Sequence, residues 1–323
     1  LALLAEQPHS PARDRLEIRL HLALGAPFLS TDGWGGPERW TAIQQTLALL
    51  PAIDQMDAHP QDAEWDALFL ALYVQADWLL SQGELAQAAQ IGEKILALAK
   101  APVSLPYVLA HRILGMIALF RGHFTEARHQ LETALAIYDA IGRPATLPLI
   151  GGDVQSACQA LLGFVLAVSG YLDRAWAQIA EALHRARRLQ PPASQGTVLI
   201  FACEVAVLRG DLSALDVLAG ELLRVGQTEG QQFFLAYGWA AEGYVRALQS
   251  SPGGEPAEAN LELIRRGMRL WKSTGAQAGI GMWIVRLADA CLQAGDIVAG
   301  LEITTDVLAK PAQPGIAIGL SQI

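Results

Sequence analysis

The chain has 323 residues and a net charge of −9, and 52% of its residues are hydrophobic whereas only 17% are charged. Its length exceeds the roughly 250 to 300 residues at which one compact core stops growing, so we expect two domains or one elongated array. The charged fraction lies below the ~25% of ordinary soluble domains, so much of the chain must be interior or face a partner. The acidic net charge disfavours direct binding to nucleic acid or to an anionic membrane, because both select basic surfaces.

The chain begins with LALLAEQPHSP, which has neither a methionine nor the basic start of a signal peptide. We therefore expect a fragment of a longer protein without a secretion signal. Residues 154–172 carry no charge and approach the length of a spanning helix. Their glutamines, serines and glycines favour a buried helix instead. Cys158, Cys203 and Cys291 are far apart, as expected for buried reduced thiols in a cytoplasmic protein.

Helical periodicity extends along nearly the whole chain, and no stretch alternates apolar and polar residues as a strand would. Prolines such as Pro102 and Pro148 lie in or beside the inferred turns. The expected helices span residues 13–24, 38–52, 62–81, 84–100, 104–120, 124–141, 153–169, 172–189, 194–209, 211–226, 231–249, 255–273, 277–293 and 296–309.

A glycine recurs between successive helices with a period of about forty residues, which is typical of a solenoid. Each glycine follows one apolar helix and precedes another, where a left-handed C-cap residue is needed. The repeat-turn glycines are Gly83, Gly122, Gly170, Gly210, Gly254 and Gly295. We expect one continuous all-α solenoid, with an irregular helical pair or cap over 1–61, helical repeats over 62–310 and a tail over 311–323.

Small residues stand at fixed distances from these glycines and would let paired helices approach closely. Gly115 and Gly163 precede a turn glycine, and Ala127 and Ala175 follow one. This arrangement resembles the tetratricopeptide repeat (TPR), and the resemblance implies a right-handed superhelix of helix pairs.

Three stretches of the sequence indicate a particular group of TPR proteins. They are LGAPFLSTDGWGGPE at 24–38, GGDVQSACQALLGFVLAVSGYLDRA at 151–175 and WKSTGAQAG at 271–279. They are similar to the TPR region of large bacterial signalling proteins, which join a STAND-type ATPase to an adenylate or guanylate cyclase or to a transcriptional regulator. The resemblance implies a cytoplasmic sensor region that acts on an ATPase or output domain of the same longer chain. The nearest analogy of architecture is the helical sensor of maltose-type activators.

No enzyme motif stands out. The sequence has no G-x-x-x-x-G-K-[ST] phosphate loop, no H-E-x-x-H and no G-x-S-x-G. We therefore expect no catalytic residues, no cofactor and no metal site. The cluster of Gly33, Gly35 and Gly36 lacks a preceding strand, so a flexible turn or a packing site for Trp34 is a better interpretation than a nucleotide site.

The concave wall of a TPR superhelix comes from the first helix of each pair, at positions about six and ten residues before the turn glycine. These positions and their equivalents in the irregular repeat predict a groove of Tyr73, Asp77, Arg112, Met116, Phe164, Ile200, Glu204, Tyr237, Tyr244 and Asp289. Such a mixture is suited to an apolar or weakly basic protein segment, or to a small-molecule effector. The alternative for each residue is packing against a neighbouring repeat.

The sequence thus predicts a non-catalytic protein- or ligand-binding sensor region. The first alternative is a self-assembly scaffold in which apolar solenoid faces pair to form a homodimer. The remote alternative is an enzyme built on α-hairpins.

Overall fold

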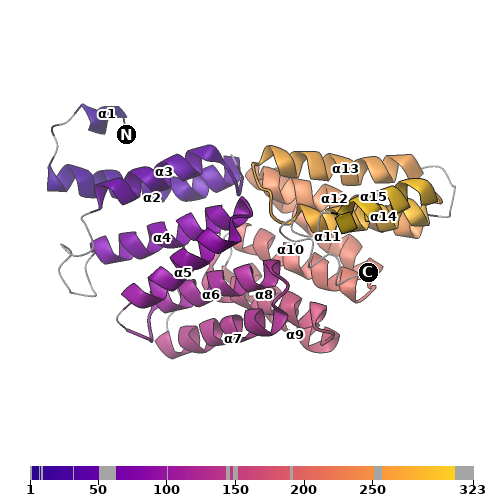
Figure 1. Cartoon of the computed structure of the whole chain (residues 1–323), viewed down its shortest axis with the longest axis horizontal. Helices are drawn as coiled ribbons and strands as arrows, with labels where there is room; N and C mark the ends of the chain where they lie inside the picture. The colour runs from indigo at the N-terminus through magenta and orange to yellow at the C-terminus, as the bar shows by residue number, and fades with distance from the viewer. Residues whose placement is uncertain are drawn as a thin grey trace.

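The computed structural model describes residues 2–6, 8, 10–31, 33–50, 63–99, 101–142, 146–147, 152–189, 192–250 and 257–309. The fold is all-α, and consecutive helices pack as antiparallel pairs into a right-handed superhelix (Figure 1). This architecture confirms the expected fold class. The predicted division at residue 62 and the tail over 311–323 involve residues outside the described ranges.

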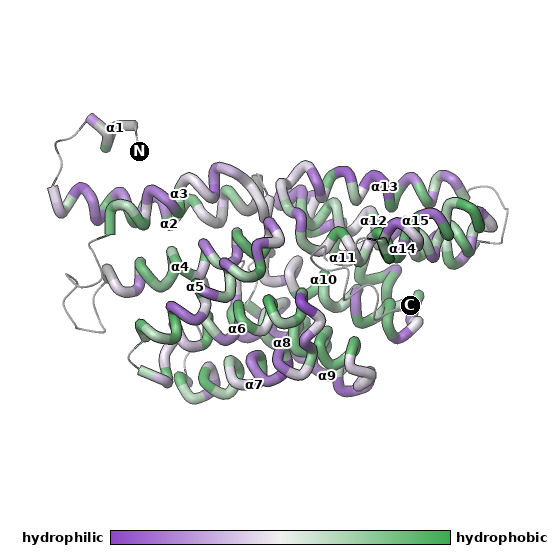
Figure 2. Tube along the Cα trace, viewed as in Figure 1, coloured by the Kyte–Doolittle hydropathy of each residue, from purple (hydrophilic) through white to green (hydrophobic). Residues whose placement is uncertain are grey.

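The first half of the chain contains α1 (Ala2–Ala5), α2 (Pro11–Thr31), α3 (Pro37–Leu49), α4 (Ala63–Ser81), α5 (Leu85–Leu98), α6 (Leu105–Phe120), α7 (Phe124–Ile141) and α8 (Val154–Val168). The second half contains α9 (Leu172–Leu189), α10 (Pro192–Leu208), α11 (Leu212–Glu229), α12 (Gln232–Gln249), α13 (Ala257–Ser273), α14 (Ile280–Gln293) and α15 (Ile297–Ala309). Figure 2 shows hydrophobic residues concentrated along α4, α6 and α8, and more hydrophilic residues along α7 and α13.

Two features differ from the sequence-based expectation. A short antiparallel pair joins β1 (Thr146–Leu147) to β2 (Gly152–Asp153), although no strand was expected. Strands of two residues are too short to show an alternating pattern. In addition, α2 runs to Thr31 instead of ending at residue 24. Pro27 removes one internal hydrogen bond, but the helix continues past it for one more turn.

The repeat-turn glycines adopt the predicted left-handed conformation. Gly122 donates its backbone N–H to the carbonyl oxygen of Leu119 (2.9 Å), and His123 donates to that of Ala118 (2.8 Å). These bonds satisfy the last carbonyls of α6. The φ angles are 82° at Gly83, 77° at Gly122, 85° at Gly170, 66° at Gly210 and 86° at Gly295. The sixth predicted turn glycine, Gly254, lies outside the described residues.

The small residues before the turns permit close packing within each pair, as predicted. A Cβ added to Gly115 would lie 2.9 Å from Cγ of Leu131 on the partner helix. A Cβ added to Gly163 would lie 3.1 Å from the carbonyl oxygen of Ala175. A side chain at either position would therefore force its neighbours to shift.

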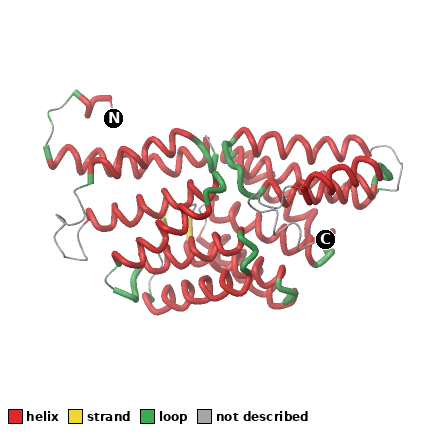
Figure 3. Tube along the Cα trace, viewed as in Figure 1, coloured by secondary structure: helices red, strands yellow, loops and turns green. Residues whose placement is uncertain are grey.

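The first helix pair contacts the last part of the described superhelix. We call this contact the junction and define it as residues 33–36, 81–82 and 274–279. Gly35 donates its backbone N–H to the Thr274 carbonyl oxygen (3.1 Å), and Gln277 and Ala278 donate theirs to that of Ser81 (2.7 and 2.9 Å). Figure 3 shows two of the loops involved facing each other between the two halves of the molecule. The junction brings residues more than 190 positions apart together, as the 3.1 Å hydrogen bond from Gln82 Nε2 to the Gly275 carbonyl oxygen shows.

Candidate ligand-binding site

The concave side of the superhelix encloses a cavity of about 120 Å³, which we call the central cavity. Its wall comes mainly from the first helices of successive pairs, namely α4, α6, α10, α12 and α14. The lining residues are Trp34, Arg39, Asp77, Arg112, Met116, Phe120, Thr197, Ile200, Phe201, Gln231, Phe233, Phe234, Tyr237, Trp271, Gly279 and Met282. The junction lies beside the cavity because Trp34 and Gly279 belong to both.

Aromatic side chains make up much of the cavity wall. The ring of Trp34 lies 6.4 Å from that of Phe120 and 6.0 Å from that of Phe233, measured between centroids. Phe233 in turn lies 4.5 Å from Trp271. These contacts are within the range of favourable aromatic pairs. They connect the loop after α2 with α6, α12 and α13, so residues far apart in the sequence complete the wall.

A buried polar cluster fixes the position of Trp34. Asp77 on α4 accepts hydrogen bonds at Oδ2 from Trp34 Nε1 (3.0 Å) and from Arg39 Nη2 (2.7 Å). Arg39 also donates to the Trp34 carbonyl oxygen (3.1 Å). The glycines around Trp34 allow the backbone to approach the other loop, because a Cβ on Gly35 would lie 2.4 Å from Gly275. This segment is a packing site for Trp34, one of the two interpretations that the sequence left open.

Arg112 on α6 is the unusual group in the cavity wall. Its side chain is only 5% exposed, and it forms no hydrogen bond or ion pair with any described residue. The guanidinium lies over the ring of Tyr73, 5.6 Å from the centroid. Burial lowers the pKa of Arg112 below its ordinary value, but an arginine keeps its charge in proteins. The cavity wall thus holds a desolvated cation without a counterion.

Two tyrosine hydroxyls near this cation also lack partners. Tyr237 lines the cavity, and its buried hydroxyl makes no hydrogen bond with a described residue. The same holds for the hydroxyl of Tyr73, whose ring packs against Arg112. Each hydroxyl can either donate or accept. Burying such groups without a partner costs free energy, so they are candidates for contact with a ligand.

The structure separates the ten predicted groove residues into two sets. Five line the central cavity, namely Asp77, Arg112, Met116, Ile200 and Tyr237. The other five do not line it, namely Tyr73, Phe164, Glu204, Tyr244 and Asp289. Phe164 is 1% exposed and packs 5.9 Å from Phe201, so it presents no free surface to a ligand. Whether any of the ten contacts a ligand stays a prediction.

Three of the predicted residues that do not line the cavity form polar contacts with other helices. They are Glu204, Tyr244 and Asp289. Glu204 on α10 and Arg286 on α14 form a buried two-pronged ion pair, in which Nη1 lies 2.8 Å from Oε1. Tyr244 on α12 donates its hydroxyl to Oδ2 of Asp289 on α14 (2.6 Å). Burial and this hydrogen bond both raise the pKa of Tyr244. These groups hold α10, α12 and α14 together.

Sequence reasoning missed several lining residues, among them Trp34, Arg39, Phe233 and Trp271. They stand outside the register counted from the turn glycines. The only sequence signal for them was the run of glycines around Trp34, which marks a close backbone approach. Nothing in the local pattern indicated that residues 33–36 and 274–279 would meet.

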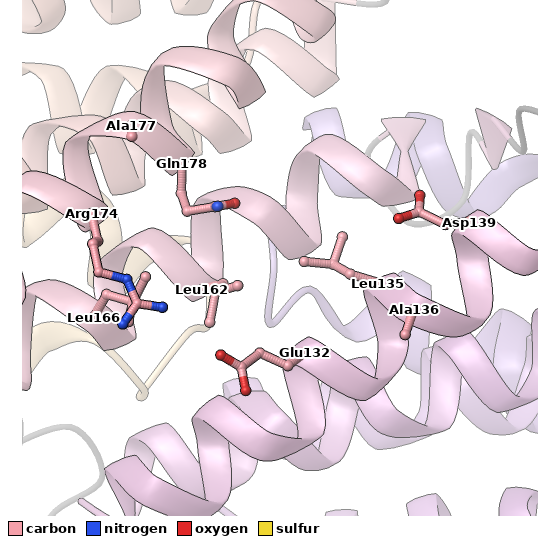
Figure 4. A pocket seen from close by; sticks show the side chains of 9 residues that line it. All are labelled: Glu132, Leu135, Ala136, Asp139, Leu162, Leu166, Arg174, Ala177 and Gln178. Atoms are coloured by element: carbon pink, nitrogen blue, oxygen red, sulfur yellow. The ribbon is translucent and has the colours of Figure 1, made fainter.

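A second cleft, of about 440 Å³, lies between α7, α8 and α9 (Figure 4). Its lining residues are Glu132, Leu135, Ala136, Asp139, Leu162, Leu166, Arg174, Ala177 and Gln178. Its charged groups, Glu132, Asp139 and Arg174, are exposed to solvent. Glu132 also accepts a hydrogen bond from Arg128 Nε (2.8 Å), whereas the Arg174 guanidinium lies over the Tyr171 ring, 5.6 Å from its centroid. This cleft therefore lacks the buried charge found in the central cavity.

The described part of the chain was also compared with the requirements of a metal site and of a membrane-spanning helix. Within it, no group of three or more His, Cys, Asp or Glu side chains is arranged to hold a metal ion. Nor does any helix there combine the length and the hydrophobicity that a membrane crossing demands. Cys158, Cys203 and Cys291 are buried and free, as the sequence predicted.

No family model matches the sequence, and no curated protein matches it. Among solved structures, the fold is similar to the crystal structure of a Rap protein complexed with Competence and Sporulation Factor. The two have a TM-score of 0.59 and 9% sequence identity, and the match covers 94% of this chain and 77% of the Rap chain. At this identity the likeness concerns the fold alone. It supports the TPR-like architecture that the turn glycines predicted.

Proposed function

We propose that the chain is a non-catalytic TPR-like sensor region that binds an effector on the concave side of its superhelix. The observation that carries the proposal is the central cavity, whose wall is completed only where the first and last parts of the superhelix meet. A ligand enclosed there would contact both parts at once, and its binding energy would favour the closed arrangement. The Rap structure, which holds Competence and Sporulation Factor, provides a precedent for a binding role of this fold.

The proposal includes the wider context that the sequence resemblance implies. Outside the junction, solenoid repeats contact mainly their neighbours, so small changes in repeat angle add up along the superhelix. A ligand that fixes the closed form would therefore change the surface available to an attached domain. We propose that this domain is the STAND-type ATPase, or its cyclase or regulator output, of a longer bacterial signalling protein in the cytoplasm.

Native mass spectrometry of the freshly purified chain at low micromolar concentration tests the proposal. We expect a reproducible small-mass adduct. Ile200→Trp should remove the adduct because the larger side chain fills the cavity, while the far-ultraviolet circular dichroism stays unchanged. The matched control is Ala136→Trp, an exposed position in the cleft between α7 and α9. An adduct retained by I200W, or lost in A136W, would contradict the proposal.

One observation favours self-assembly as a second function. The last described helix, α15, exposes four aliphatic side chains, Ile297 (59%), Val298 (68%), Leu301 (57%) and Leu308 (57%). Such an apolar face is typical of an interaction surface. If two copies pair through it, sedimentation velocity will show a concentration-dependent dimer that Val298→Asp with Leu301→Asp abolishes. A monomer at all concentrations would dismiss this function for the chain.

A further inference from the structure

We propose that the effector is a small monocarboxylate with an apolar body, and that Arg112 binds its carboxylate in the central cavity. The inference deepens the proposed function and rests on it, because it names the chemical class of the molecule that the cavity takes.

The first argument compares Arg112 with the other buried arginines of the described chain. Arg39 pairs with Asp77, Arg286 pairs with Glu204, and Arg13 lies 3.2 Å from Glu17. Arg112 is as buried as these, yet no described acidic side chain lies within 4.0 Å of it. A buried charge is ordinarily paired, and an unpaired one is strongly unfavourable. A bound anion would give Arg112 the partner that the other three have.

The second argument concerns the groups around Arg112, none of which can neutralise it. The Cys158 thiol, which lies close enough to interact electrostatically, has its pKa raised to about 12, chiefly by burial, and is neutral. Asp77 on the cavity wall is already neutralised by Arg39. The lining therefore keeps one net positive charge from Arg39, Asp77 and Arg112. The unpaired Tyr237 hydroxyl is a further donor for an anionic oxygen.

The charge and shape of this site favour a carboxylate over a phosphate. A single guanidinium balances the single charge of a carboxylate, and its planar fork can bind both carboxylate oxygens. A phosphate carries close to two charges and needs more than one cation. The sequence led us to expect an apolar or weakly basic partner. The structure reverses the expected sign of the partner's charge. The acidic groups of the predicted groove are already paired with Arg39, Arg286 and Tyr244, so they are not free to attract a basic partner.

The size and lining of the cavity define the rest of the molecule. An apolar cavity of roughly 150 Å³ is known to accept benzene, and this cavity measures about 120 Å³. Met116, Ile200 and Phe233 present apolar surface to it. The space suits a benzene-sized or branched aliphatic body and excludes a folded protein segment. We therefore assign the site to a free small molecule.

The test uses the whole chain and three matched probe pairs: benzoate with benzamide, phenylacetate with phenylacetamide, and 4-methylpentanoate with its amide. Trp34 and Trp271 line the cavity and report binding by their fluorescence. We expect at least one carboxylate to bind saturably and at least tenfold more tightly than its amide. If no carboxylate exceeds its amide, the inference is wrong.

The variant Arg112→Met separates this inference from the proposed function. Methionine fills a similar volume without a charge, so we expect R112M to lose the preference for carboxylate over amide at least tenfold. The control Arg128→Met removes an arginine that pairs with Glu132 away from the cavity, and it should keep the preference. If carboxylate and amide bind equally to the native chain, yet I200W blocks both, the cavity binds ligands and only the carboxylate assignment fails. If I200W has no effect on any binding, the proposed function fails as well.

Stability without ligand provides a readout that does not depend on the choice of probe. Because Arg112 has no counterion in the empty cavity, ligand-free R112M should unfold at a temperature equal to or higher than that of the native chain. A clearly lower unfolding temperature would show that Arg112 is already satisfied, and would overturn the inference.

Discussion

Glu204 and Arg286 form the most deeply buried ion pair in the described chain, linking α10 to α14. Removing one partner leaves an uncompensated buried charge, which costs about 3 to 5 kcal/mol. We expect Glu204→Ala to lower the free energy of unfolding in urea by that amount. The double variant E204M/R286M should recover most of the loss because no charge remains.

The exposed pair Arg187–Glu221 serves as the control for this prediction. Glu221→Ala should change the free energy of unfolding by less than ~1 kcal/mol, as is usual for surface ion pairs. If E204A and E221A lower the free energy of unfolding equally, burial does not set the strength of the Glu204–Arg286 pair.

The three cysteines allow a second test at the scale of single residues. Burial raises the pKa of all three thiols, and that of Cys158 reaches about 12. A free thiol becomes more reactive between pH 7 and 9 because the thiolate population rises near pH 8.5. We expect the native chain to label slowly with a thiol reagent, with no such rise, and to label at all three cysteines in urea. Rapid native labelling that follows a pKa near 8.5 would contradict this.

At the scale of helices and turns, the left-handed glycines should be separable from ordinary helical ones. Gly170 has φ = 85° and open space around its Cα, so Gly170→Ala introduces backbone strain without a clash. We expect it to lower the free energy of unfolding by about 1 kcal/mol.

Gly220 lies inside α11, exposed and without close neighbours. Gly220→Ala should instead stabilise the chain by ~0.5 to 1 kcal/mol, because alanine is the better helix former. Denaturant unfolding of the two variants measures both signs.

The sequence predicted the helices well because their signals are local. An apolar face repeats every turn, and glycines such as Gly122 and Gly170 end the first helix of a pair wherever φ must be positive. The β1–β2 pair was missed because two residues show no periodicity. The helix expected at 13–24 runs on to Thr31 as α2, because Pro27 removes only one hydrogen bond near the helix end.

At the scale of the whole molecule, the sequence predicted a groove on the first helices of the pairs. It did not predict that residues 33–36 and 274–279 would meet beside this groove. The register from the turn glycines, extended to the equivalent wall of the irregular repeat, predicted groove positions for Arg112 and Tyr237, and both residues line the cavity. It placed Glu204 and Tyr244 in the groove as well, although they are paired with groups on α14. Closure depends on the sum of many small rotations between repeats, which no single stretch of sequence encodes. Trp34 could therefore not be assigned to the cavity from its neighbours.

The junction provides the last prediction. In Gly35→Ala the new Cβ would lie 2.4 Å from the Gly275 backbone, so the two loops must separate. We expect loss of hydrogen-exchange protection at Gln277 and Ala278, whose amides donate to Ser81, together with a larger radius of gyration in solution scattering. Protection in α7 and α9 should not change, because neither helix contributes a residue to the junction and the stability of a solenoid is largely local. Gly220→Ala, distant from the junction, should change neither quantity.

If G35A keeps native protection at 274–279, the closed arrangement does not depend on this backbone contact. If protection is lost, weaker effector binding should accompany it, because Trp34 would leave the wall that encloses the ligand.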